Sequence, residues 1–364
     1  EAENPNISCR VVRLSEPLLL HSSASPLAVR MANELNQPET QISLENDGRY
    51  VLSNIEYRTS VDDADGLSER IFKPQGVYLI TGGFGGIGLE IAEFLATHFK
   101  ARLILCGRNS AKVEVLARLE LLRQQGAEVL CIECDVSRKQ DTDWLVNQSR
   151  ARFGVINGLI HCAGVLNDGL LINKTDLIVN EVLSAKIAGT INLDESLSQE
   201  KLDFFVLFSS LTAVYGSAGQ SDYAIGNDFL SHFSERRQRL ESKQLRFGRS
   251  RSISWPLWQN GGMRLGTSAN TTRFEELGFK ALGIDQAMRA FSIAVSSPLH
   301  AVQVMYGNAS KIRQTLLVDD SQRTAHSVSL AQPRVQARTN TLPIVNNNIE
   351  ILNTVRDAFV HELG

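Results

Sequence analysis

The glycine-rich segment at residues 81–88 constrains the fold of this chain more than any other feature. It follows an apolar run at residues 77–80 that predicts a strand, and it precedes a helical pattern at residues 88–98. Glycines between a strand and a helix let the backbone turn tightly and approach a pyrophosphate, whose charge is met by N–H groups at the helix N-terminus. We therefore predict a dinucleotide-binding loop, the alternative being an ordinary flexible glycine loop. The loop consists of Thr81, Gly82, Gly83, Phe84, Gly85, Gly86, Ile87 and Gly88.

Strand and helix patterns alternate from residue 76 onward. Near-continuous apolar strands that alternate with helices predict a parallel sheet covered by helices on both faces. The expected fold class is therefore α/β, a doubly wound parallel sheet. The further strands are expected at residues 102–106, 129–133, 158–161, 204–209 and 251–254, with 302–306 closing the sheet and a helix at 111–125.

The segment at residues 1–58 reads as the closing part of a smaller structural unit. Ser25 and Pro26 form a cap and first turn for a helix at residues 27–35, after an apolar–polar stretch at residues 7–14. Two strand patterns, at residues 41–45 and 49–55, are joined by Asn46-Asp47-Gly48, a hairpin signal. Since this fragment is too small to bury its own core, we expect it to pack on the domain that follows.

Polar segments delimit the main domain. Residues 59–75 are expected to be a linker, residues 76–318 the catalytic domain, and residues 319–348, rich in Ser, Gln, Thr and Asn, a second linker. Residues 349–364 regain helical spacing. They are either the first helix of a further domain or a capping helix of the main one.

Composition excludes several partners and sites. The formal net charge is −3 without runs of like charge, so neither nucleic acid nor an anionic membrane is expected as a partner. The sequence lacks both an uninterrupted apolar run of roughly 18 residues and a secretion signal, which predicts a cytoplasmic location. Cys131 and Cys134 form a CxxC, but on a strand they point to opposite faces, and the histidines form no metal-binding motif. We expect reduced cysteines and no metal.

Residues after the next strands are candidates for cofactor binding. No acidic residue occurs between Arg102 and Ser110, whereas Arg108 suits the 2'-phosphate of NADPH; the alternative is a solvated surface arginine. Asp135, followed by Val136, is expected either to contact the adenine or to cap the next helix. Ala163 and Gly164 follow a strand at the edge where a parallel sheet presents its ligand crevice.

Four polar residues downstream form a candidate reacting centre: Lys186, Ser210, Tyr223 and Asn227. Hydride transfer to a ketone leaves negative charge on oxygen, so such a site needs an acid and hydrogen-bond donors. Tyr223 and Asn227 are four residues apart on an expected helix and share a face. A tyrosine pKa of about 10 must be lowered for this role, and a nearby lysine ammonium is the expected cause. The alternatives are a core tyrosine and a capping serine.

These residues resemble the short-chain dehydrogenase/reductase superfamily. Familiar members place lysine four residues after tyrosine, whereas this chain has Asn227 there and Lys186 upstream, in Lys186-Ile187-Ala188-Gly189. That exchange is similar to the ketoreductase domains of modular polyketide synthases. The resemblance covers residues 76–307 and includes Phe205-Val206-Leu207-Phe208-Ser209-Ser210, Gly219-Gln220-Ser221-Asp222-Tyr223 and Trp255-Pro256-Leu257-Trp258.

The resemblance implies a Rossmann-like ketoreductase that uses NADPH. It makes Tyr223 the proton donor, Ser210 a ligand of the carbonyl oxygen, Lys186 the residue that holds the nicotinamide ribose and acidifies Tyr223, and Asn227 its support. Pro256 and Leu257 would contact the cofactor, and Met263 would lie in a mobile substrate lid. Residues 1–58 resemble part of a truncated, noncatalytic Rossmann-like subdomain, and residues 349–364 the entry to a carrier protein.

The resemblance also implies a substrate and a stereochemical outcome. Leu166-Asn167-Asp168 is similar to the Leu-Asp-Asp signature of B-type ketoreductases, which give D-hydroxy products, although Asn167 departs from it. Tyr215 stands where A-type enzymes carry Trp, and Gln220 lies near the same site. An Asp-Gly turn is the alternative for Asp168. The expected partners are an acyl carrier protein bearing a ketoacyl phosphopantetheine and the other synthase domains of the same module.

Three other functions remain open from the sequence. One is a reductase of the same fold in a nonribosomal peptide synthetase, acting on an α-ketoacyl thioester. Another is a noncatalytic structural domain, although Tyr223 and Lys186 are both present. The third is a metabolic dehydrogenase of a free small molecule.

Overall fold

The structure, a computed structural model, describes residues 3, 11–14, 24–35, 37, 41–45, 48–51, 56, 66–109, 113–260 and 274–316. The chain divides into two units, residues 1–318 and 319–364. The expected second linker and final helix lie outside the described residues, as does Met263.

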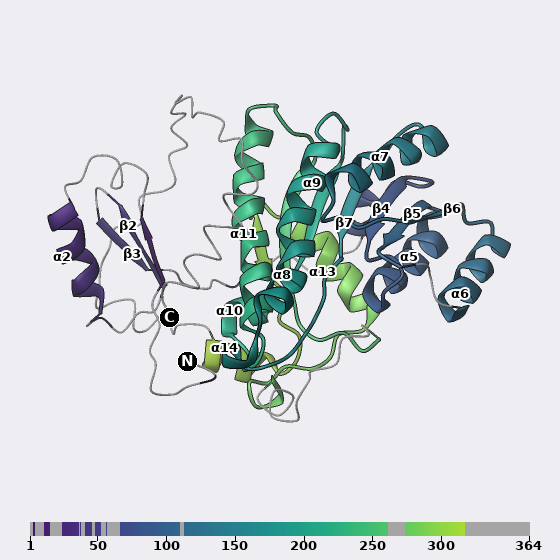
Figure 1. Cartoon of the computed structure of the whole chain (residues 1–364). Helices are drawn as coiled ribbons and strands as arrows, with labels where there is room; N and C mark the ends of the chain where they lie inside the picture. The colour runs from purple at the N-terminus through teal and green to yellow at the C-terminus, as the bar shows by residue number, and fades with distance from the viewer. Residues whose placement is uncertain are drawn as a thin grey trace. The chain divides into compact units, whose positions relative to one another are not determined.

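A seven-stranded sheet forms the centre of the main domain (Figure 1), and every neighbouring pair of its strands is parallel. The strand order is β10-β9-β8-β7-β4-β5-β6. The predicted doubly wound α/β fold is therefore confirmed. The strands are β4 (Val77–Thr81), β5 (Arg102–Gly107), β6 (Val129–Glu133), β7 (Gly158–His161), β8 (Phe204–Ser210), β9 (Arg249–Trp255) and β10 (Ala301–Gln303).

Helices cover both faces of this sheet because strand side chains alternate between them. Tyr78 and Ile80 of β4 pack with one group of helices, and Val77 and Leu79 with the other. The first group comprises α5 (Gly86–Phe99), α6 (Val113–Gln124) and α13 (Ile284–Ser296), and the second α7 (Lys139–Phe153), α9 (Ala188–Ser196) and α11 (Ser221–Ser242). None of the helices in the described part of the chain is long and apolar enough to cross a membrane.

The chain reverses its direction across the sheet at β4, which pairs with β5 on one side and β7 on the other. Ligands of open α/β sheets bind at such a switch point, beyond the carboxyl ends of the strands. The glycine loop and the segment after His161 both leave the sheet there. The shorter elements at this edge are η1 (Leu171–Asn173), α8 (Asp176–Lys186) and α10 (Thr212–Tyr215), and α14 (Ala309–Leu316) comes last along the described chain.

A separate three-stranded sheet lies in the N-terminal segment, with strands β1 (Val11–Leu14), β2 (Gln41–Glu45) and β3 (Gly48–Val51). The predicted hairpin is confirmed, since β2 and β3 are antiparallel and Glu45 pairs with Gly48. Helix α2 (Ala24–Glu34) begins earlier than expected, so Ser25 lies inside its first turn. Residues 52–55 of the expected strand lie outside the described residues.

The expected linker at residues 59–75 differs from the structure in its second half. Helix α4 (Leu67–Ile71) lies there, and Phe72 is fully buried in the main core. The Phe72 ring contacts Phe99 and Phe291, with ring centroids 5.2 and 5.3 Å apart. The sequence did not indicate this short helix because the segment is mostly polar and only Leu67, Ile71 and Phe72 form its apolar face. Near the other end, β10 covers only the first part of the expected strand at residues 302–306.

Candidate active site

Two adjoining clefts open at the carboxyl edge of the sheet. One, the glycine-loop cleft, is lined by the turn after β4 and by the ends of β5, β6 and β7. The other, the tyrosine cleft, is lined by the end of β8, by α10 and by the start of α11. Ile87 and Cys162 line both, so the two clefts are continuous. The glycine-loop cleft has a volume of about 490 Å³, which suits a small-molecule ligand.

The glycine loop is packed so closely that Gly82, Gly83 and Gly88 leave no room for a side chain. Gly82 has φ +66°, and a Cβ on it would lie 2.9 Å from the backbone N of Ala163. A Cβ on Gly88 would lie 2.4 Å from the carbonyl oxygen of Gly82. Helix α5 begins at Gly86, earlier than the sequence predicted. The first N–H groups of an α-helix have no carbonyl partner within the helix, and the first three residues of α5 line the glycine-loop cleft. This arrangement suits an anionic group.

Thr81 lies beneath the cleft and does not line it. Its Oγ1 lies 2.6 Å from Nδ1 of His161 and accepts the N–H of Ala163 at 3.3 Å. His161 Nε2 lies 3.2 Å from the carbonyl oxygen of Ala185. Burial lowers the pKa of His161 to about 3, so its ring is neutral. With its proton on Nε2, the ring donates to Ala185 and accepts from Thr81, so every group in this series of hydrogen bonds is paired. The series connects β4 to the wall of the cleft. Gly83 is likewise absent from the residues lining the cleft.

The remaining predicted cofactor residues divide between the clefts. Arg108, Asp135 and Val136 line the glycine-loop cleft, as do Phe84, Gly85, Gly86, Ala163 and Gly164. Asp135 Oδ1 accepts hydrogen bonds from N and Oγ of Ser137, at 3.0 and 2.8 Å, so this oxygen is engaged in the turn before α7. Arg108 lies 3.7 Å from Glu181 in an exposed ion pair. Pro256 and Leu257, predicted to touch the cofactor, line the tyrosine cleft.

Three of the four predicted reacting residues line the tyrosine cleft. Lys186 is the last residue of α8, Ser210 ends β8, and Tyr223 lies in the first turn of α11. Asn227 is fully buried one turn further along α11. Residues from three separate elements thus converge at the edge where the glycine loop also ends.

Lys186 is buried, and its Nζ donates to the carbonyl oxygen of Phe208 at 2.6 Å. Burial lowers the pKa of this lysine to about 8, an effect that the nearby Cys162 opposes. Gly164 makes room for the side chain, since a Cβ there would lie 3.0 Å from Lys186 Cε. The side chain therefore lies in the wall of the tyrosine cleft, next to Gly164 of the glycine-loop cleft, with its pKa lowered to about 8.

The pKa of Tyr223 is raised, which contradicts the predicted lowering. Burial is the main cause, hydrogen bonds from Asn227 and Ser210 oppose it, and the charge of Asp168 adds to it. Lys186 does line the same cleft, but the groups that oppose the effect of burial on this pKa are Asn227 and Ser210. The hydroxyl consequently stays protonated at neutral pH, which is the state that a proton donor requires.

Asn227 is predicted to support Lys186, and in the structure its side-chain amide is hydrogen-bonded within its own helix. Its Nδ2 donates to the carbonyl oxygen of Tyr223 at 2.8 Å, while Ser209 Oγ donates to the carbonyl of Asn227 at 2.9 Å. Asn227 Oδ1 is buried and finds no hydrogen-bond partner among the described residues. An unpaired buried acceptor of this kind is suited to a ligand or water.

The residues predicted for stereocontrol gather around the tyrosine cleft. Leu166, Tyr215 and Gln220 line it, and Asp168 approaches through a hydrogen bond from Gln220 Nε2 at 3.0 Å. Tyr215 Oη donates to Gln303 at 3.0 Å, and burial raises its pKa to about 12.

Sequence reasoning missed the apolar wall of the tyrosine cleft. Phe274, Leu277 and Phe279 line it, with the rings of Phe274 and Phe279 stacked 4.8 Å apart. They lie between β9 and β10 along the chain, and no motif marks them. Among the residues that the structure describes, no cluster of His, Cys, Asp and Glu could hold a metal ion.

Comparison with known proteins gives consistent findings. The family described as "KR domain" matches residues 76–260, about half of the chain. The chain is 31% identical to "Polyketide synthase PksN" of Bacillus subtilis over 88% of its own length, but it spans only 6% of that protein. It is 30% identical to "6-methylsalicylic acid synthase" of Penicillium patulum over 74% of its length, spanning 16% of that protein.

A solved structure agrees with these matches. The crystal structure of a ketoreductase domain from the bacillaene assembly line is 32% identical to this chain, with a TM-score of 0.74. The match covers 85% of this chain and 72% of the other.

Proposed function

The chain belongs to the KR domain family, and on that premise we propose that it is an NADPH-dependent ketoreductase. The proposed substrate is a β-ketoacyl thioester on an acyl carrier protein, and the product is the D-β-hydroxyacyl thioester of polyketide biosynthesis. The observation that carries this proposal is the meeting of Tyr223, Ser210 and Lys186 in one cleft that continues into the glycine-loop cleft.

The residues of the glycine-loop cleft fit a phosphorylated dinucleotide. Gly82 and Gly88 leave no space for a side chain, which keeps the backbone open to a pyrophosphate. Arg108 lines the cleft with a guanidinium suited to a 2'-phosphate. Ala163 and Gly164 face the same space from the end of β7. These residues would hold NADPH, which when bound supplies the hydride.

The chain's own residues then manage the oxygen of the ketone. The hydroxyl of Ser210 would hydrogen-bond to this oxygen, and Tyr223, kept protonated by its raised pKa, would donate its proton to it. An alkoxide is far more basic than tyrosinate, so the transfer is downhill even with the pKa raised. Lys186 would hold the cofactor ribose and stabilise the tyrosinate left behind.

The D-configuration rests on the residues that flank Tyr223. Asp168 stands at the second acidic position of the B-type signature and is tied to Gln220 on the wall of the cleft. An apolar wall that includes Phe279 limits where an acyl chain lies. The proposed partners are an acyl carrier protein and the neighbouring domains of a synthase.

The test compares the wild type with Tyr223→Phe, using Tyr50→Phe on the N-terminal sheet as the matched control. NADPH consumption is followed with a β-ketoacyl thioester and, separately, an α-ketoacyl thioester, and the alcohol is analysed by chiral chromatography. We expect the β-keto substrate to give the D-alcohol, and Tyr223→Phe to lose at least about a hundredfold in kcat while still binding NADPH. Turnover of the α-keto substrate alone would move the protein to peptide synthetase chemistry. Substantial turnover by Tyr223→Phe would remove the proton-donor role.

A further inference from the structure

A buried ion pair lies next to the reacting tyrosine. Lys174 Nζ lies 2.6 Å from Asp222 Oδ1, and both side chains are only 2% exposed. Asp222 immediately precedes Tyr223 in the first turn of α11, and its Oδ1 also accepts the backbone N–H of Tyr223 at 2.8 Å. No other residue in the described part of the chain forms an ion pair with this aspartate.

The lysine of this pair comes from the other side of the cleft. Lys174 follows η1, and its Nζ also donates to the carbonyl oxygen of Asn167 at 2.8 Å. Asn167 belongs to the segment that carries Asp168, here called the Asp168 loop (residues 165–170). Both Asn167 and Asp168 are exposed, so a buried ammonium holds the backbone of an otherwise exposed loop.

Two further direct contacts join the same segments, and the carboxylate of Glu3 bridges them by accepting the N–H groups of Leu171 and Gly219, at 2.7 and 2.9 Å. Gly169 N donates to the carbonyl oxygen of Gly219 at 2.9 Å, and Gln220 Nε2 donates to Asp168 at 3.0 Å. These are contacts between groups that water can replace. The ion pair differs because removing one partner leaves the other charge buried and uncompensated.

From this geometry we propose that Lys174 and Asp222 are positioning residues that hold the Asp168 loop against the first turn of α11. The pair fixes the wall of the tyrosine cleft relative to the Tyr223 hydroxyl, and so sets which face of the ketone meets it. Neither residue lines the tyrosine cleft, so both act through the loop and the helix. The catalytic consequence of this inference rests on the proposed reductase function, whereas the contact between the Asp168 loop and α11 does not.

The test uses the full chain with Lys174→Met and Asp222→Asn. Methionine keeps the length of the lysine stem without charge, and asparagine keeps the acceptor for the Tyr223 N–H. Lys139→Met is the matched control, because Lys139 also pairs with an aspartate, Asp143, but on the exposed surface of α7 and away from both clefts. If Lys174→Met does not fold, Asp222→Asn decides.

Two measurements are made on each variant. Amide hydrogen exchange is followed in the peptide covering residues 165–174. In the second measurement, 3-oxopentanoyl pantetheine thioester is reduced with NADPH, the thioester is hydrolysed, and the two enantiomers of 3-hydroxypentanoate are separated. We expect faster exchange, a fall of about tenfold or more in both the enantiomer ratio and kcat, and a KM within about threefold of the wild type. The Lys139→Met control should match the wild type in every measurement.

The outcomes separate this inference from the proposed function. Exchange rates equal to those of the wild type would overturn the tie, and faster exchange with unchanged kcat and enantiomer ratio would overturn its role in positioning. If the wild type binds NADPH but reduces no thioester, the proposed function fails, while the exchange rates still decide whether the pair holds the loop.

Discussion

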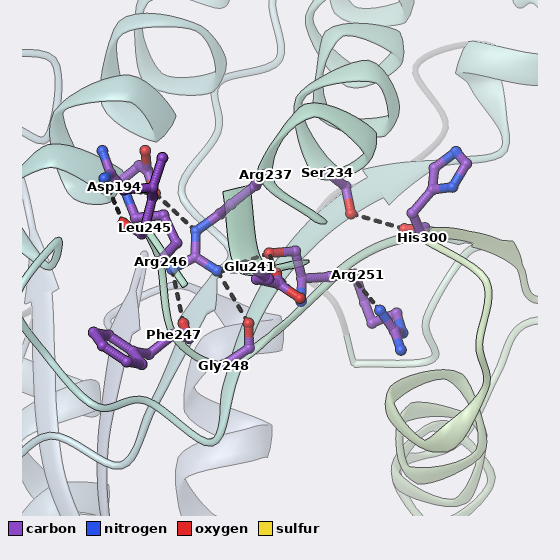
Figure 2. Close-up of polar contacts among 11 residues, drawn as sticks. Asp194, Ser234, Arg237, Glu241, Leu245, Arg246, Phe247, Gly248, Arg251 and His300 are labelled. Atoms are coloured by element: carbon purple, nitrogen blue, oxygen red, sulfur yellow. Dashed lines mark hydrogen bonds and ion pairs between the residues drawn. The ribbon is translucent and has the colours of Figure 1, made fainter. Parts of the chain in front are cut away.

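The buried guanidinium of Arg237 is expected to stabilise the scaffold that carries Tyr223. Figure 2 shows this side chain among a group of polar residues that includes Asp194 and Glu241. The guanidinium also donates to the carbonyl oxygen of Gly248, just before β9 begins, whereas the clefts lie at the carboxyl ends of the strands. Its Nε donates to Asp194 at 2.7 Å and its Nη1 to Ser250 Oγ at 2.7 Å, and the guanidinium lies 4.1 Å from the centre of the Phe205 ring. Burial lowers the pKa of Arg237, while the carboxylates of Asp194 and Glu241 oppose that change.

The cost of replacing Arg237 with Met follows from these contacts. Removing one partner of a buried ion pair costs about 3–5 kcal/mol, because the other charge stays buried. Here Arg246 still donates to Asp194 at 3.0 Å, so the lower end, about 3 kcal/mol, is expected. For a domain of this size each kcal/mol lowers Tm by about 2–4 °C, which gives a fall of about 6–12 °C.

Thermal unfolding of the wild type, Arg237→Met and Arg239→Met measures this difference. Arg239 belongs to the same helix and pairs with Glu235, but its side chain is 67% exposed, so its replacement should shift Tm by no more than about 2 °C. Equal shifts for the two variants would refute the reasoning, because burial would then make no difference to the cost of losing the ion pair.

Three further predictions concern the clefts. Since burial lowers the pKa of Lys186 to about 8, kcat/KM should fall above about pH 8. Between pH 8 and the ordinary lysine pKa this lysine is protonated in the unfolded chain but not in the folded one, so the free energy of unfolding should rise with pH. Denaturant titrations should show this rise in the wild type relative to Lys186→Met. Gly88→Ala places a Cβ 2.4 Å from the Gly82 carbonyl oxygen, so it should lower the free energy of unfolding by about 1–3 kcal/mol and weaken NADPH binding in a fluorescence titration. In the control Gly48→Ala the new Cβ makes only an ordinary van der Waals contact, so neither quantity should change. Arg108→Ala should raise the KM for NADPH by roughly tenfold to a hundredfold and leave that for NADH unchanged; equal effects on both would remove Arg108 from 2'-phosphate binding.

The sheet could be predicted from the sequence because its strands are buried on both faces and read as apolar runs. The bounds of β6 and β7 agree to the residue with the prediction. Residues whose burial depends on distant partners could not be found in this way. Phe72 follows a polar stretch, and only its packing against rings such as Phe291, far along the chain, shows that it belongs to the core.

The residues of the candidate site also divide into those that a sequence pattern predicts and those that only the three-dimensional structure reveals. Lys186, Ser210 and Tyr223 lie at the ends of elements that the sequence pattern shows, and the parallel topology brings such residues to one edge. Lys174 belongs to no motif, and Asp222 lies in the motif around Tyr223 but has no role assigned there; their ion pair joins residues that are 48 positions apart. Periodicity cannot find a contact of this kind, because neither residue stands out until the loop and the helix are placed in space.

The charge states of the site depend on burial, which spacing does not report. A lysine near a tyrosine suggested a lowered phenol pKa, but the structure buries both groups, and desolvation acts on each in the direction of its neutral form. Both charge states suit reduction. The phenol of Tyr223 keeps its proton and can act as the acid, and Lys186, with a pKa of about 8, remains mostly protonated at neutral pH. Oxidation of the alcohol would need tyrosinate as the base, and the raised pKa makes tyrosinate scarce at neutral pH.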